Sequence, residues 1–192
     1  MSLDAIKATF QASIDTKTLL VNDIERLEAL LEVAGVASST LKAGHKMMLC
    51  GNGGSAADSQ HIAAELIGRF EKERQSMAAI ALTTDTSALT AIGNDYGYDQ
   101  VFSRQVEGLG QSGDLLIGIS TSGNSKNVVK AMQVAKSKGI RTVALVGDKP
   151  EGAMQAIADY VLAAPSTNTA RIQESHILMM HTLCQLVESD SV

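Results

Sequence analysis

Tryptophan is absent from this chain of 192 residues, which also contains only two prolines, three phenylalanines and two cysteines. Two cysteines are too few for the disulfide framework of a small secreted domain, so we expect Cys50 and Cys184 to be buried packing residues. No apolar run approaches the roughly 20 residues that cross a bilayer. The first residues lack the charged and then apolar pattern of a signal peptide. These absences predict a cytoplasmic protein without membrane contact.

Positive charge is never concentrated in one stretch of the chain. The formal net charge is −5, and no run rich in lysine and arginine occurs, which argues against non-specific nucleic-acid binding. Apolar residues make up 45% of the chain, enough for one α/β domain with a substantial core. Because there is no linker, low-complexity segment or repeat, we expect a single domain over residues 1–192.

The N-terminal part is predicted to be helical over residues 3–41, because leucines recur there at spacings of three and four. Gly35 is expected to interrupt the helical pattern. The apolar stripe must be covered, either by the protein's own sheet or by another subunit. We favour a subunit contact, which makes residues 1–44 a helical extension packed on the domain and on neighbouring subunits.

Short apolar runs alternate with helical patterns from Lys46 onward. The expected strands are residues 47–50, 78–82, 115–119, 142–146 and 160–163. The expected helices are residues 55–70, 87–92, 100–109, 127–138, 152–157 and 168–188. This alternation predicts an α/β/α sandwich whose parallel sheet is covered on both faces.

Two loops that follow predicted strands have the composition of anion sites. They read Gly51-Asn52-Gly53-Gly54-Ser55 and Ser120-Thr121-Ser122-Gly123-Asn124-Ser125, and each opens a helix. Hydroxyls and the unpaired N–H groups of a helix start can hold a phosphate, and strand ends share one sheet edge. Either loop alone could be a helix cap or turn. Two such loops at one edge favour a phosphorylated ligand.

Nucleotide motifs fit these loops poorly. No lysine follows in the manner of a P-loop. The first loop does match G-x-G-x-x-A through Ala56, but Glu71, at the distance of a ribose-binding acid, lies in a charged stretch rather than after a strand. The dinucleotide signal is therefore weak.

His61 and Glu65 lie four residues apart, on one face of the helix that follows the first loop. In the last helix, Gln173 and His181 are eight residues apart and roughly 80° apart around the axis, so both can point into one site. Two imidazoles, a carboxylate and an amide oxygen suit Zn²⁺ or a similar divalent ion. A general acid/base pair without metal fits the same residues equally well.

The remaining polar candidates carry weaker signals. Asn94 and Asp95, expected just after a helix, could bind sugar hydroxyls, but Asx residues beside glycine are often turn formers. Arg69 could reach a phosphate or hydroxyl, or simply stabilise a helix C-terminus. A further set is expected to be structural or surface residues: His45, Glu174 and His176.

Four motifs in unbroken order resemble the phosphoheptose isomerase family of the sugar-isomerase (SIS) superfamily: GNGGSAADSQHIAAEL, LTAIGNDYG, GISTSGNS and ARIQESHILMMH. The resemblance covers residues 46–187 and implies a flavodoxin-like fold with a five-stranded parallel sheet. It also implies a homotetramer with sites at subunit interfaces. The implied reaction converts sedoheptulose 7-phosphate to D-glycero-D-manno-heptose 7-phosphate by enediol proton transfer, for ADP-heptose and lipopolysaccharide core synthesis.

The same resemblance assigns roles to residues of this chain. Glu65 and His181 would be the catalytic pair. His61, Glu65, Gln173 and His181 match positions that bind zinc in some family members, one ion per subunit. The implied substrate-binding residues are Asn52, Gly53, Gly54, Ser55, Glu65, Arg69, Asn94, Asp95, Ser120, Thr121, Ser122, Ser125 and Gln173.

A different function is possible within the same superfamily. The DnaA initiator-associating proteins share the fold and the RIQE motif, and they act by protein interaction. They lack the carboxylate at position 65 and the imidazole at position 181, both of which this chain has. Proton transfer needs these groups, so the isomerase reading is preferred and DnaA is a partner only under the alternative. A sugar-phosphate sensor is disfavoured because no DNA-binding segment is present.

Overall fold

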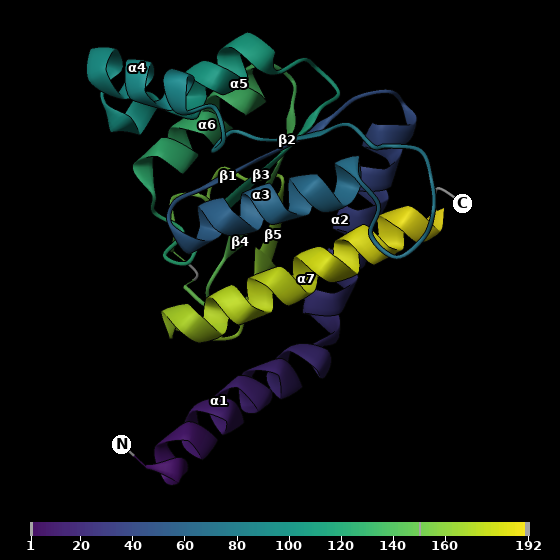
Figure 1. Cartoon of the computed structure of the whole chain (residues 1–192), viewed down its shortest axis with the longest axis vertical. Coiled ribbons are helices and arrows are strands. Elements are labelled where there is room, and N and C mark those ends of the chain that lie inside the picture. The colour runs from purple at the N-terminus through teal and green to yellow at the C-terminus, as the bar shows by residue number, and fades with distance from the viewer. Residues whose placement is uncertain (1, 150, 191–192) are drawn as a thin grey trace.

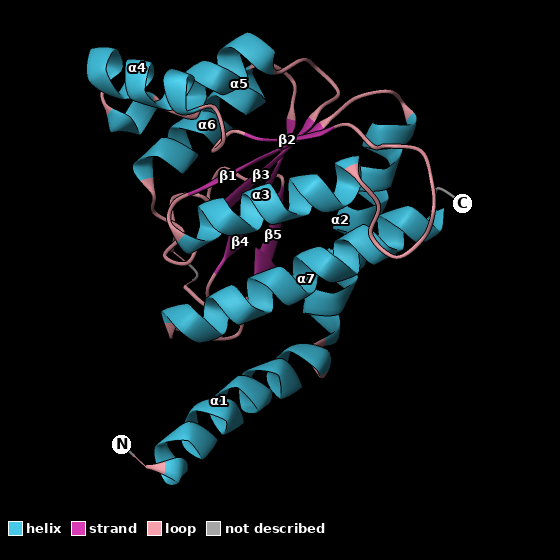
Figure 2. Cartoon of the chain, viewed as in Figure 1, coloured by secondary structure: helices cyan, strands magenta, loops and turns pink. Residues whose placement is uncertain are grey.

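A five-stranded parallel sheet forms the centre of the molecule, with helices on both of its faces (Figures 1 and 2). The computed structural model describes residues 2–149 and 151–190; Met1, Pro150, Ser191 and Val192 of the expected 1–192 domain lie outside the described residues. The strand order is β2-β1-β3-β4-β5, and every neighbouring pair is parallel. This is the flavodoxin-like order, which confirms the expected fold class.

The sequence predicted all five strands, with ends shifted by at most one residue. They are β1 (Met47–Gly51), β2 (Ala79–Ala81), β3 (Leu115–Ser120), β4 (Arg141–Val146) and β5 (Tyr160–Ala163). The helices are α1 (Leu3–Val21), α2 (Ile24–Lys42), α3 (Gly54–Ile67), α4 (Thr86–Tyr96), the 3₁₀ helix η1 (Tyr98–Gln100), α5 (Ser103–Leu109), α6 (Lys126–Ser137) and α7 (Thr169–Asp190).

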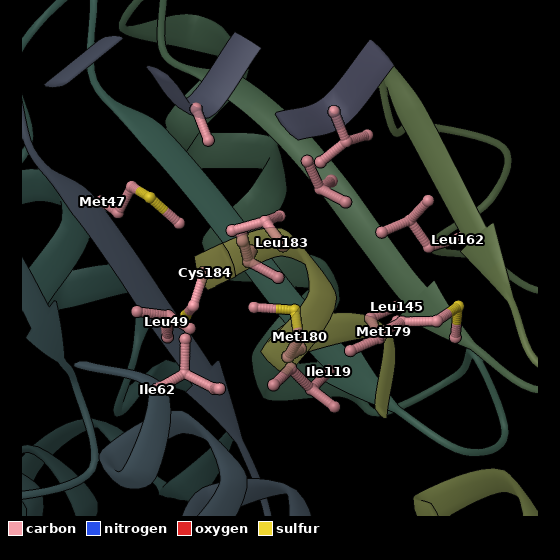
Figure 3. Close-up of a cluster of buried hydrophobic side chains, with 14 of the residues drawn as sticks. Met47, Leu49, Ile62, Ile119, Leu145, Leu162, Met179, Met180, Leu183 and Cys184 are labelled. Carbon is pink, nitrogen blue, oxygen red and sulfur yellow. The ribbon is translucent and has the colours of Figure 1, made fainter. Parts of the chain in front are cut away.

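Side chains at alternate positions of each strand lie in two separate apolar cores, because successive side chains point to opposite faces of a sheet. Met47 and Leu49 of β1 pack on the face covered by α2, α3 and α7, whereas Met48 and Cys50 pack on the face covered by α5 and α6. Figure 3 shows Met180 and Leu183 of α7 within the first core. The amphipathic α7 is thus fixed on the sheet by its apolar side.

Both cysteines lie in these cores. Cys50 and Cys184 are free and buried, and burial raises the pKa of each thiol to about 12. The expected packing role is therefore confirmed. In the part of the chain that the structure describes, no helix has the length and apolarity to cross a membrane.

The N-terminal segment forms two helices that part at Asn22–Asp23 rather than at Gly35. Asp23 caps α2 by accepting a hydrogen bond from the backbone N–H of Arg26 at 3.1 Å. The expected interruption at Gly35 is wrong, since one helical glycine costs only about 1 kcal/mol and the rest of α2 is well packed. Figure 1 shows α1 extending away from the sheet.

Polar contacts hold α1 against α7. Ser13 donates to Glu174 at 2.6 Å, and Arg171 donates to the carbonyl oxygen of Thr9 at 2.8 Å. Glu174 therefore has a structural role, as expected. A neighbouring side of α1 exposes large apolar side chains by 53–74%, among them Leu3, Ile6, Phe10 and Ile14. The predicted apolar stripe is thus covered only in part by the single chain, because Leu20 and Leu30 are buried in the first core.

Three other expectations need correction. Residues 152–157 form turns rather than a helix, because their N–H groups bond to the loop after β3: Met154 donates to the carbonyl oxygen of Gly123 and Ala153 to the side chain of Asn124. Asn94 and Asp95 lie inside α4, which runs four residues further than predicted. The helix expected at residues 100–109 starts at Ser103, after η1.

His176 is completely buried in α7, and its Nε2 lies 2.9 Å from the carbonyl oxygen of Val146. Burial disfavours the imidazolium and lowers the pKa of His176 to about 4, although the hydrogen bond to Val146 acts in the opposite direction. His176 is therefore a neutral core residue, as expected.

This lowered pKa predicts a loss of stability as the pH falls. The unfolded chain takes up a proton near pH 6.5 that the folded chain does not take up until about pH 4. The contribution of neutral His176 to the free energy of unfolding is thus complete above about pH 6.5 and declines below it, by up to about 1.4 kcal/mol per pH unit. We predict that His176→Gln shows a smaller fall in unfolding free energy between about pH 7 and pH 5 in urea titrations. Equal falls in variant and wild type would contradict this.

Candidate active site

The carboxyl ends of β1 and β3 are the natural ligand edge of this sheet. From β1 the chain proceeds to β2 on one side, and from β3 to β4 on the other, so the strand order reverses between them. Ligands of open α/β sheets bind outside the strand ends at such a point. The two loops singled out in the sequence follow these two strands. The structure therefore brings them together as expected.

The glycines of the first loop allow neighbouring groups to approach its backbone closely. Gly53 has φ of 57°, a left-handed conformation that glycine adopts without strain. A Cβ on Gly54 would lie 2.4 Å from Nε2 of Gln173, so α7 approaches the loop directly at this point. Ser55 is buried at the start of α3, where its carbonyl oxygen accepts a hydrogen bond from Ser59.

The second loop gathers three hydroxyls. The Oγ of Ser120 lies 2.9 Å from the Oγ of Ser125 and 3.3 Å from the Oγ of Ser122. The carbonyl oxygen of Thr121 accepts from Gly147, which fixes the loop to the end of β4. These hydroxyl groups can rotate to donate to a bound anion.

Neither α3 nor α6 has a side-chain cap within the described residues, although both helices begin at these loops. By contrast, Ser2, Asp23 and Asp85 cap α1, α2 and α4. Ser125 stands at the N-cap position of α6, yet its hydroxyl is bonded to Ser120 instead. The helix-capping alternative is therefore wrong for Ser125, and the first N–H groups of both helices face the ligand edge.

Asn52 connects the two loops through residues that the sequence analysis did not identify. The amides of Asn52 and Asn127 exchange hydrogen bonds of 2.9 and 2.8 Å, and the hydroxyl of Tyr98 lies 3.3 Å from Oδ1 of Asn52. Asn127 is buried. Because its partner lies 75 residues away, only the fold reveals this pair.

His61, Glu65 and His181 converge from α3 and α7, as the sequence predicted. The Nε2 atoms of the two imidazoles are 2.8 Å apart, and Nε2 of His61 is 3.3 Å from Oε1 of Glu65. The imidazole rings meet edge to face, with centroids 5.0 Å apart. Figure 1 shows why they meet: α3 and α7 lie side by side and run in the same direction. One carboxylate and two imidazoles thus share a small volume.

The three groups fit a divalent cation. One ligand atom from each lies within 4.8 Å of the others. Nε2 of His61 approaches both a carboxylate oxygen and a second imidazole nitrogen, and a neutral His61 carries at most one proton there. A single proton on Nε2 of His61 therefore cannot satisfy both contacts, and at least two lone pairs face each other here without a proton between them. Nitrogen and oxygen ligands of this kind suit Zn²⁺, although an acid/base cluster without metal uses the same contacts.

Other predicted site residues lie apart from this cluster. The amide of Gln173 lies against Gly54, and the backbone of Gln173 is about 12 Å along the helix axis from that of His181. Gln173 must therefore turn toward His181 to become a fourth ligand. Asn94 and Asp95 are exposed and bonded to each other at 2.8 Å. Arg69 is 61% exposed and faces Glu73 at 3.9 Å.

Two further ionisable residues can be placed relative to this cluster. Asp58 lies one turn before His61 on α3, and its Oδ2 is buried without a hydrogen-bond partner among the described residues. Burial raises the pKa of Asp58, while the charges of His61 and His181 act in the opposite direction. The spacing of three residues to His61 could have revealed Asp58. His45 lies elsewhere, 3.8 Å from Asp114, which agrees with a structural role.

Sequence and fold are both similar to those of known proteins. The chain matches the family model described as the SIS domain over residues 14–147. It is 58% identical to a phosphoheptose isomerase of Akkermansia muciniphila over 159 residues, which cover 83% of this chain and 84% of that protein.

Two solved structures are similar along almost the whole chain. A phosphoheptose isomerase from Neisseria gonorrhoeae has a TM-score of 0.90 and 46% identity, covering 97% of this chain and 98% of that one. A phosphoheptose isomerase from Francisella tularensis has a TM-score of 0.93 and 39% identity, covering 98% of this chain and 99% of that one.

The convergence of imidazoles and carboxylate predicts metal binding that can be measured without any reaction. We predict that His61→Ala and His181→Ala each weaken Zn²⁺ binding by the metal-free protein about 100-fold or more, because each removes one ligand. Competition with a chromophoric chelator measures the affinity. His45→Ala is the matched control, since His45 lies outside the cluster. Unchanged affinity in both site variants would exclude a metal centre here.

Proposed function

The chain belongs to the phosphoheptose isomerase family of SIS-domain proteins, which are aldose–ketose isomerases, and from this we propose that it converts sedoheptulose 7-phosphate to D-glycero-D-manno-heptose 7-phosphate. The observation that carries the proposal is the approach of Glu65 to His181 and His61 beside two uncapped helix starts. Such a site can bind a phosphate at one end of a sugar and move protons at the other.

Glu65 is proposed as the base. Its carboxylate would remove a proton from C1 of the ketose, which leaves an enediolate across C1 and C2, and would return the proton to C2. His181 would donate a proton to the oxygen on C2, which limits the negative charge that develops there, and would then take the hydroxyl proton from the oxygen on C1, which becomes the aldehyde carbonyl. Both roles are supported by the position of one ligand atom of each group within 4.8 Å of the other. The transfer is internally balanced and needs no external oxidant or reductant.

The serine loop is proposed to hold the phosphate. The hydroxyls of Ser120, Ser122 and Ser125 gather beside the start of α6, and the loop from Asn52 to Ser55 opens α3 next to it. Binding a remote phosphate fixes the reacting carbons against the base. A further set is proposed to contact the sugar: Arg69, Asn94, Asp95, Thr121 and Gln173.

A divalent cation, with Zn²⁺ the best match, is proposed to bind His61, Glu65 and His181, with Gln173 as a further ligand. When bound, it would supply Lewis-acid stabilisation of negative charge. The same three side chains can act as proton donors and acceptors by themselves. The donor set supports one ion per subunit.

The assembly is proposed to be a homotetramer of one-domain subunits, with residues 1–44 packed on neighbouring subunits. The exposed apolar side of α1 supports this, because Leu3, Ile6, Phe10 and Ile14 are uncovered in the single chain. Exposed apolar patches of this kind mark contact surfaces between proteins. Sites at subunit interfaces follow from the same proposal.

The biological setting stays a prediction. We expect the product to enter ADP-heptose and lipopolysaccharide core synthesis in the cytoplasm. The alternative, a DnaA-associating regulatory protein, has no specific observation in its favour among the described residues. A pull-down against DnaA beside a turnover assay separates the two functions.

Replacing the base gives the most direct test of the mechanism. Glu65→Gln keeps the shape of the side chain but removes its ability to accept a proton, so we predict a loss of turnover of about 1000-fold. A coupled assay of aldose formation measures it. Glu107→Gln is the control, because Glu107 is exposed on α5 and its carboxylate pairs with Arg104, outside the site. Turnover of the Glu65 variant within about tenfold of wild type would remove Glu65 from the base role.

The phosphate cradle is tested by Ser120→Ala combined with Ser122→Ala. Each lost hydrogen bond to a charged group costs about 1.5–3 kcal/mol, so we predict that KM rises roughly 30-fold or more with a smaller change in kcat. Ser137→Ala is the control, since Ser137 lies at the opposite end of α6 and bonds only to the local backbone. An unchanged KM would show that the phosphate binds elsewhere.

A further inference from the structure

One buried ion pair connects the ends of the two helices that carry the site. The Nε of Arg74 lies 3.1 Å from Oε1 of Glu188, and the two side chains are only 4% and 2% exposed. Arg74 belongs to the loop after α3, and Glu188 lies near the end of α7. Because water is excluded, this contact is stronger than a surface ion pair and costly to break on one side only.

Glu188 also fixes the backbone of the loop. Its carboxylate accepts hydrogen bonds from the N–H groups of Phe70, Glu71 and Lys72, at 3.2, 2.8 and 2.9 Å. Burial alone would raise the pKa of Glu188, but these donors and the Arg74 guanidinium outweigh it, and the pKa is lowered. The carboxylate is therefore charged when it holds the loop.

Other N–H groups of the Arg74 guanidinium donate hydrogen bonds to backbone carbonyl oxygens at the end of α3. Its guanidinium donates to the carbonyl oxygens of Glu65 and Leu66 at 2.8 and 2.9 Å, and to that of Gly68 at 3.3 Å. The last carbonyls of a helix have no partners inside it, so the guanidinium completes the end of α3. One of these carbonyls belongs to Glu65 itself.

The loop then returns to the site through Phe70. The ring of Phe70 stacks on the imidazole of His181, with centroids 5.5 Å apart and planes inclined by 22°. Glu188 lies seven residues after His181, and therefore on nearly the same side of α7, displaced by about 20°. Glu188 thus holds the segment whose aromatic ring rests on His181.

We propose that Arg74, Glu188 and Phe70 form a clamp of positioning residues that sets Glu65 against His181. The inference rests on the proposed function, in which these two groups move protons. Arg74 fixes the backbone of Glu65, Phe70 fixes the ring plane of His181, and Glu188 joins the other two. Displacements of about 1 Å in a reacting group can lower a rate about 100-fold, so a clamp outside the substrate pocket controls kcat.

The experiment compares Phe70→Leu with Phe70→Tyr. Leucine keeps an apolar side chain but has no ring plane, whereas tyrosine keeps the ring. We expect Phe70→Leu to lower kcat about tenfold with KM changed less than about twofold, and Phe70→Tyr to stay within about twofold of wild type.

A second measurement follows the His181 ring in the metal-free protein. The stacked Phe70 ring should shift the carbon-bound protons of His181 in the NMR spectrum, and Phe70→Leu should abolish that shift while Phe70→Tyr retains it. Loss of the signal in His181→Gln assigns it among the four histidines. Because this measurement needs no turnover, it tests the clamp even if the proposed reaction is wrong.

Arg74→Lys tests the other arm of the clamp. Lysine keeps a positive charge opposite Glu188 but cannot reach several carbonyls at once. We expect kcat to fall about tenfold or more, with inorganic phosphate affinity within about twofold of wild type. Arg104→Lys, at an exposed pair with Glu107, is the matched control. If Arg74→Lys does not fold, the Phe70 pair decides.

Two results would overturn the clamp. One is a Phe70→Leu variant whose kcat and His181 signals match those of wild type. The other is a fall in kcat that Phe70→Tyr shares, because the aromatic ring would then not be the positioning element.

Discussion

The packing of α7 on the sheet beside α3 is the constraint on which the rest of the site depends. Met180 and Leu183 are buried in the core between α7 and the sheet, so the neighbouring side of α7, which meets α3, has a fixed height and rotation. Three contacts with α3 then follow in order along the helices: Gln173 at Gly54, His181 at His61, and Glu188 through Arg74 at Glu65. Apolar burial, which is not directional, fixes α7 on the sheet. The polar side chains of α7 therefore have defined positions relative to α3.

The two ends of this helix pair serve different chemistry. At one end, loops after β1 and β3 leave helix starts without side-chain caps and gather the hydroxyls of Ser120, Ser122 and Ser125. About two to three turns further along α3, His61 and Glu65 meet His181. In the proposed function, anchoring and proton transfer would thus be separated along one helix, and a phosphorylated sugar would bridge them.

The sequence predicted the strands and the His61–Glu65 pair because both are local patterns, whereas the meeting with His181, 120 positions away, was expected from the donor types and the family resemblance. Buried parallel strands read as continuous apolar runs, and His61 and Glu65 share a helix face through their spacing alone. It failed where tertiary contacts decide: residues 152–157 bond to the serine loop, and α2 continues through Gly35. Arg74 and Glu188 are 114 positions apart, so no local signal joins them. Asp58 was missed although its spacing to His61 was visible.

The uncapped helix starts have an energetic consequence for the whole protein. The N-termini of α3 and α6 follow neighbouring strands of one parallel sheet, so their positive dipole ends lie at the same edge and repel one another. A bound anion relieves that repulsion and favours the native state over the unfolded chain, by RT ln(1 + [L]/Kd). If the proposed phosphate site is correct, resistance to heat and proteases would rise with the concentration of the phosphorylated substrate, and the lifetime of the protein would be coupled to that supply.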